Sequence, residues 1–215
     1  MSLKSTEAKL YHALYDFFDQ EGYSLLIDKK QFRKTVSAGF VNVIFSVSEY
    51  HYDNDAWVEV HIGCRNDQIE QIAQQFLKVN LNDFRPDANT LIISIGRYNE
   101  VKYFRYKIQS EEDLVDTCEA IKEFMKVSGF PFLQTVCHLD EIDRLLNTHP
   151  NRPCKFLYNQ IHRCFKGAIA ARLTDNPHYQ GIGDIYNIYV HKFGNEQEQL
   201  SYEQLLHFLQ YYSAN

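Results

Sequence analysis

The 215-residue chain lacks the features that would assign it to several special classes of protein. No apolar run approaches the roughly 18–20 residues of a membrane-spanning helix, and Met1 to Lys4 lack the apolar stretch of a signal peptide. Basic residues (22) do not outnumber acidic ones (28), and a net charge of −6 disfavours general nucleic-acid binding, which needs a basic surface to replace phosphate counterions. We therefore expect a soluble cytoplasmic protein whose partner is neither a membrane nor a nucleic acid.

Cysteine is scarce, with five residues at irregular positions among apolar neighbours, which is typical of reduced, buried thiols. The densest group of cysteine and histidine raises a zinc hypothesis, because zinc prefers thiolate and imidazole ligands. Structural zinc sites place pairs of ligands about two to four residues apart, whereas the nearest pair here would point about 200° apart on a helix. We expect no metal and no other cofactor. The group comprises Cys137, His138, His149, Cys154, His162 and Cys164.

The common catalytic signatures are absent as well. The sequence has no P-loop, no G-x-G-x-x-G, no H-E-x-x-H, no G-x-S-x-G and no C-x-x-C. A cysteine–histidine nucleophile is conceivable, but nothing in the spacing selects a pair. The absence of these signatures favours a protein that is not an enzyme, but it does not decide whether the protein has an activity.

Hydrophobic periodicity is present and divides the chain in two. An amphipathic helix with a left-handed cap at Gly22 precedes segments of period two, and a second short helix capped by Asn66 interrupts them. From Ser110 onward the period is helical throughout. Strands early and helices late predict an α+β fold: an N-terminal antiparallel β-sheet with flanking helices (1–109) and a C-terminal helical half (110–215), packed together. The expected helices are 4–21, 67–77, 110–129, 131–149, 153–173, 178–193 and 201–212, the last capped by Ser201; the expected strands are 23–27, 31–36, 41–47, 57–65, 90–95 and 101–108.

The strands around the turn 53–55 predict a hairpin with one apolar side. If Val47 faces Val60, a single register places every apolar residue on that side. Tryptophan and tyrosine often anchor interfaces, so the other side is a candidate binding surface. The alternative is that a helix covers this side and makes the only tryptophan part of the core. The candidate residues are Tyr50, Trp57, Glu59 and His61.

The segment 102–107 interleaves bases with aromatic residues on the last expected strand. Such a strand could stack bases of a single-stranded nucleic acid, with Arg105 near phosphate. The alternative, which the net charge favours, is a half-buried strand with Phe104 and Tyr106 toward the core and its basic side chains outward.

An acidic stretch follows between residues 111 and 143, and a stretch with bases and no acids lies between 152 and 172. The acids fit a solvated helix face neutralised by the basic helix beside it. They also fit a docking surface for a basic partner, because charge steers encounter. The candidate residues are Glu111, Glu112, Asp113 and Asp116.

Three short motifs carry a resemblance to a known group of proteins: Gly22-Tyr23, Ser110-Glu111-Glu112-Asp113-Leu114 and Phe130-Pro131-Phe132-Leu133. In this order the chain resembles a poorly characterised bacterial family of unknown function, over roughly residues 8–173. That family has no established catalytic residues. The resemblance implies a small cytosolic protein that, like many immunity proteins of bacterial toxin systems, acts by binding another protein.

These observations lead to one hypothesis and one rival. The hypothesis is a non-catalytic protein-binding module whose acidic, aromatic-anchored surface masks a basic partner. The rival is a small-molecule enzyme or binder that uses a sheet–helix cleft near His61 and Arg105.

Overall fold

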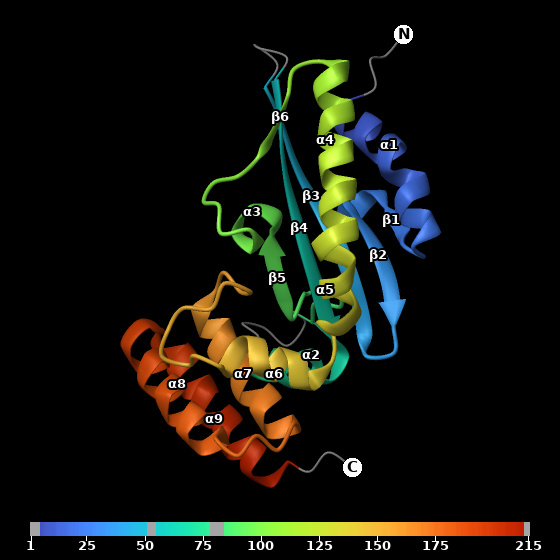
Figure 1. Cartoon of the computed structure of the whole chain (residues 1–215). Helices are drawn as coiled ribbons and strands as arrows, with labels where there is room; N and C mark the ends of the chain where they lie inside the picture. Colours follow the sequence, from blue (N-terminus) through green and yellow to red (C-terminus); the bar gives the residue numbers. More distant parts are fainter. Residues whose placement is uncertain (1–4, 51–54, 78–83, 213–215) are drawn as a thin grey trace. The chain divides into compact units, whose positions relative to one another are not determined.

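A computed structural model describes residues 5–50, 55–77 and 84–212 of the chain. It confirms the α+β fold, with an antiparallel six-stranded sheet in the N-terminal half and most helices in the C-terminal half (Figure 1). The chain forms two compact units: unit 1 is built from Met1–Gly63 and Ile93–Thr135, and unit 2 from Cys64–Ile92 and Val136–Asn215. Within the described ranges, no helix combines the length and the apolar character needed to cross a membrane. The division expected at residues 109 and 110 stays a prediction.

The sheet runs in the order β1-β2-β3-β4-β5, and β6 pairs with β4 beside this path. Antiparallel register is set by pairs such as Leu25 with Phe32, Phe32 with Val43 and Val58 with Tyr106. Alternate residues of β4 are buried, as the period of two predicts. The strands are β1 (Ser24–Leu26), β2 (Gln31–Val36), β3 (Gly39–Tyr50), β4 (Asp55–Asn66), β5 (Leu91–Ser94) and β6 (Tyr106–Ile108).

Helices α1 (Thr6–Gln20) and α4 (Glu111–Phe124) lie side by side on one face of the sheet in unit 1 (Figure 1). The predicted stripe of α1 is buried, and the ring of Phe18 stacks on that of Phe32 with centroids 4.4 Å apart. Tyr11 meets Phe45 edge-on. Gly22 has the predicted left-handed conformation, with φ of +80°. The aromatic cluster therefore anchors α1 to strands β2 and β3.

The prediction that one helix ends at Gly129 and another begins at Pro131 is wrong. A π-helical segment, η2 (Met125–Gly129), joins α4 directly to α5 (Phe130–Thr135). The backbone N–H of Phe130 donates to the carbonyl of Met125, five residues back, so the hydrogen-bond pattern changes just before a proline that has no N–H to donate. The proline is thereby accommodated without breaking the helix.

The strand expected over 101–108 is also wrong for most of its length. A short helix, α3 (Ile95–Tyr98), follows β5, and only β6 is extended. Glu100 and Tyr103 have left-handed backbones (φ of 62° and 59°), which a strand cannot contain. Phe104 packs so closely on α3 that a Cβ at Gly96 would lie 2.4 Å from its Cβ. Tyr103 is consequently 99% exposed rather than part of a sheet.

Unit 2 packs its helices around α7, whose side chains are buried over most of its length. The expected helix start at 153 is wrong: Asn159 caps α7, and the side chain of Gln160 holds the preceding turn by accepting from the N–H of Cys154 at 2.8 Å. The cap expected at Ser201 is wrong too, because Asn195 and Glu198 form a capping box six residues earlier. The helices are α2 (Asp67–Phe76), α6 (Leu139–Asn147), α7 (Gln160–Leu173), α8 (Tyr179–Phe193) and α9 (Glu196–Tyr211).

Candidate functional site

The outer side of β4 in unit 1 carries Trp57, Glu59 and His61, which alternate with the buried side chains of the face under α1 and α4. Trp57 is half-buried, and the ammonium group of Lys107 lies 5.6 Å from its ring centroid. Lys107 in turn forms an ion pair of 2.9 Å with Asp55. Trp57 is therefore neither a core residue nor a free anchor. Tyr50 is the last residue of β3, and its side chain lies outside the described part of the structure.

Glu59 lies between the side chains of His61 and Arg105 on this outer side. Its carboxylate oxygens are 3.6 Å from the Nε2 of His61 and 3.6 Å from the Nε of Arg105. Burial lowers the pKa of His61, and the nearby carboxylate of Glu59 opposes that shift only in part. Near neutral pH the imidazole is therefore mostly uncharged. The structure brings together three of the predicted residues here, as a surface cluster of one base, one acid and one neutral imidazole.

The predicted acids lie on α4, on the opposite side of the sheet from Trp57. Four exposed carboxylates recur at spacings of four, three and four residues, which places them in one stripe on the solvent side of the helix. The opposite side of α4 is buried through Leu114, Cys118 and Ile121. The stripe consists of Glu112, Asp116, Glu119 and Glu123, and we call it the acidic stripe.

The four acids of the stripe differ in their partners. Glu119 pairs with Lys122 at 2.9 Å, and this hydrogen bond lowers the pKa of its carboxyl group. Among the residues that the structure describes, Glu112, Asp116 and Glu123 make no ion pair. Like charges three and four residues apart on a helix repel, each pair costing roughly 0.2–0.5 kcal/mol. The acids without an ion pair thus add a small electrostatic cost on this surface, which Lys122 offsets at Glu119.

The other two predicted acids have local partners. Glu111 forms an ion pair with Lys9 of α1. Asp113 accepts a hydrogen bond from the backbone N–H of Gln109 at 2.9 Å, while Ser110 accepts from the N–H of Asp113 at 3.1 Å. Hydrogen bonds to its carboxylate, from the backbone N–H of Gln109 first and then from Ser110, lower the pKa of Asp113. The carboxylate of Asp113 therefore holds the backbone just before the N-cap residue Ser110.

Two arginines of the basic stretch have partners within unit 2. The guanidinium of Arg163, 4% exposed, donates to carbonyl groups in the last turn of α6 and just after it, Leu146 O and His149 O. Arg172 donates to Leu209 O and Tyr212 O at the end of α9. Arg163 and Arg172 thus bind carbonyl groups, and the interpretation of a basic helix that neutralises the acidic stretch stays a prediction.

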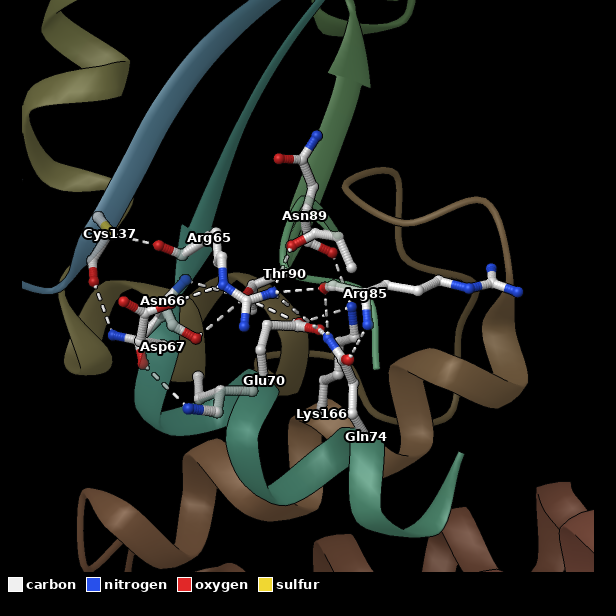
Figure 2. A network of polar contacts seen from close by, with 12 residues as sticks. Arg65, Asn66, Asp67, Glu70, Gln74, Arg85, Asn89, Thr90, Cys137 and Lys166 are labelled. Atoms are coloured by element: carbon white, nitrogen blue, oxygen red, sulfur yellow. Dashed lines mark hydrogen bonds and ion pairs between the residues drawn. The ribbon is translucent and has the colours of Figure 1, made fainter. Parts of the chain in front are cut away.

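Sequence reasoning missed a buried polar network in unit 2 (Figure 2). Glu70 of α2 is 1% exposed, and its Oε1 lies 2.7 Å from the Nζ of Lys166 on α7. Arg65, at the end of β4, is 3% exposed and lies 4.0 Å from the other carboxylate oxygen. The hydroxyl of Thr90 and the amide of Gln74 also donate to this carboxylate, each at 3.0 Å. Every charge in the network is thus paired.

The same network holds the segment 85–90 against α2. Arg65 donates to the carbonyls of Arg85 and Ala88, and Lys166 donates to that of Asn89 at 2.7 Å. Moving an ion pair out of water is costly, and hydrogen bonds such as those of Arg65 and Lys166 to these carbonyls offset part of that cost. The only sequence signal was a charged residue on an apolar stripe: Glu70 beside Ile69 and Ile72 on α2, and Lys166 among the small and apolar residues of α7. Among the described residues, the charged groups of this network are engaged with one another and with backbone carbonyls, which fits a structural role.

No group of three or more histidine, cysteine, aspartate or glutamate side chains in the described ranges could hold a metal ion. No protein-family model matches the chain, and searches of curated proteins and of solved structures also found no match. The resemblance to a bacterial family and an immunity-like role accordingly stay predictions.

Proposed function

We propose that this protein is a non-catalytic binding module that docks a basic protein segment on the acidic stripe of α4. The observation that carries the proposal is that Glu112, Asp116 and Glu123, on an exposed helix face, make no ion pair with any residue that the structure describes. The helix dipole accounts for acids in the first turn, but Asp116 and Glu123 lie beyond it. A cationic partner would relieve the repulsion along the stripe, and this relief adds to the attraction.

Exposed apolar side chains border the stripe and would supply contact area. Val115 is 60% exposed and Val127, in the π-helical segment, is 71% exposed. Charge at an interface mainly raises the association rate and selects the partner, whereas buried apolar contacts slow dissociation. The fitting partner is thus a segment that alternates lysine or arginine with apolar residues. Trp57, on the other side of the sheet, is not part of this surface.

The test compares two triple charge reversals in the full chain, with binding measured by fluorescence anisotropy. The probe is a labelled amphipathic peptide of lysine and leucine. In the first variant, Glu112, Asp116 and Glu123 become lysine. In the matched control, Asp175→Lys, Glu196→Lys and Glu203→Lys make the same change in net charge on exposed positions of unit 2.

We expect the stripe variant to bind the peptide at least tenfold more weakly than the wild type at low salt. The control should stay within about threefold, and the difference should shrink in 0.5 M salt as the charges are screened. Equal losses in both variants would mean that only net charge matters and would refute docking on α4. If only the stripe variant loses binding, a photo-crosslinking residue in place of Val115 would identify the native partner from a lysate.

A further inference from the structure

Two of the five cysteines meet inside unit 2. Cys64 lies near the end of β4 and is fully buried. Cys137 lies between α5 and α6 and is 5% exposed. The thiol of Cys64 donates to Val136 O at 3.4 Å, and the thiol of Cys137 donates to Arg65 O at 3.1 Å. Each thiol thus bonds to the backbone beside the other cysteine.

We propose that Cys64 and Cys137 form a reversible intramolecular disulfide and that its oxidant is a small disulfide such as oxidised glutathione. The reciprocal contacts hold both side chains toward each other, which is the arrangement that a disulfide requires of its two partners. Cys164, by contrast, donates to Gln160 O of its own helix. The pair therefore differs from an ordinary buried thiol.

The two thiols are also chemically unequal. The neighbouring side chain of Cys64 lowers the pKa of Cys137, although burial opposes this, whereas burial raises the pKa of Cys64. Thiol–disulfide exchange begins with a thiolate, so the more acidic and more exposed Cys137 attacks first.

The exchange balances in two steps. The Cys137 thiolate attacks one sulfur of oxidised glutathione, which forms a mixed disulfide and releases one glutathione thiolate. Cys64 then loses its proton to solvent and attacks the Cys137 sulfur, which closes the protein disulfide and releases the second glutathione. Two protein thiols are oxidised and one glutathione disulfide is reduced to two thiols.

Oxidation would act on the buried network directly. Both S–H donors disappear, so Arg65 O and Val136 O lose these hydrogen bonds. Asn66, which caps α2, donates its side-chain amide to Cys137 O at 3.0 Å, and the new bond would fix this contact. A cross-link between distant segments also removes freedom from the unfolded chain. We therefore expect the oxidised form to unfold at a higher urea concentration.

The experiment equilibrates the full chain in glutathione redox buffers, starting both from the native reduced protein and from protein refolded in each buffer. Free thiols are then alkylated under denaturing conditions and mapped by mass spectrometry. We expect the loss of two alkylated cysteines and one cross-linked peptide that joins Cys64 to Cys137. Cys64→Ser should stop at a glutathione adduct on Cys137, and Cys164→Ser should oxidise like the wild type. If neither starting point yields the Cys64–Cys137 peptide, or if another pair forms, the proposal is overturned.

Discussion

Replacing Glu70 with glutamine tests the energetics of the buried network. The substitution keeps the shape of the side chain but removes the charge that faces the Lys166 ammonium at 2.7 Å. Removing one partner of a buried ion pair costs roughly 3–5 kcal/mol, because the other charge stays buried without compensation. Lys166 keeps its hydrogen bond to Asn89 O, so we expect the lower end, about 3 kcal/mol.

For a chain of this size, 1 kcal/mol shifts the melting temperature by about 2–4 °C, so Glu70→Gln should lower it by about 6–12 °C. Urea unfolding followed by far-UV circular dichroism would give the free energy of unfolding. Trp57, the only tryptophan, lies in unit 1, so its fluorescence reports separately on that unit. The matched control is Asp175→Asn, which removes a 90% exposed partner of Arg172 and should cost well under 1 kcal/mol.

The double variant Glu70→Gln with Lys166→Met isolates the uncompensated charge. Because methionine removes the unpaired ammonium, the double variant should recover at least half of the lost stability. A single variant within 1 kcal/mol of the wild type would refute the reasoning. So would a double variant no more stable than the single one, because the loss would then come from packing.

Three further substitutions test packing and ionisation in α7 and α8. Gly167→Ala should cost about 2 kcal/mol in urea unfolding, because the new Cβ would lie 2.6 Å from Asn147 Oδ1 and 2.8 Å from a ring carbon of Tyr186. Gly181→Ala, whose Cβ meets nothing within 4 Å, should instead stabilise α8 by up to about 1 kcal/mol, and a similar loss in both would contradict this. Burial raises the pKa of Cys164 to about 12, so the unfolded chain releases this proton from about pH 8.5 while the folded chain keeps it. Between pH 9 and 11 the wild type should therefore lose about 1.4 kcal/mol per pH unit more than Cys164→Ala, and parallel curves would disprove the assignment.

Local patterns predicted many elements because they depend on neighbours a few residues apart. The alternation in β4, the buried stripe of α1 and the caps at Asn66 and Ser110 all follow from such spacing, and the structure confirms them. The errors arose where a distant contact decided the local conformation. In the segment 101–105, where a strand was expected, the chain turns instead and Phe104 packs against Gly96.

The candidate site was predicted in part. The acids of α4 could be found from charge and helical period, and the cluster of Glu59, His61 and Arg105 was identified residue by residue. Their states could not be predicted: Asp113 binds the backbone N–H of Gln109, and Trp57 lies under Lys107. Which charge is free depends on what surrounds it in three dimensions.

The sequence by itself determined the α+β class and the apolar faces of the strands and of most helices, since burial of periodic apolar side chains is the main driving force of folding. Only the tertiary structure decided where the charges find partners. Lys166 meets an acceptor 77 positions away at Asn89, and Cys137 donates to a carbonyl 72 positions away at Arg65. Hydrogen bonds and ion pairs are short-ranged and directional, so they depend on how the chain brings distant residues together.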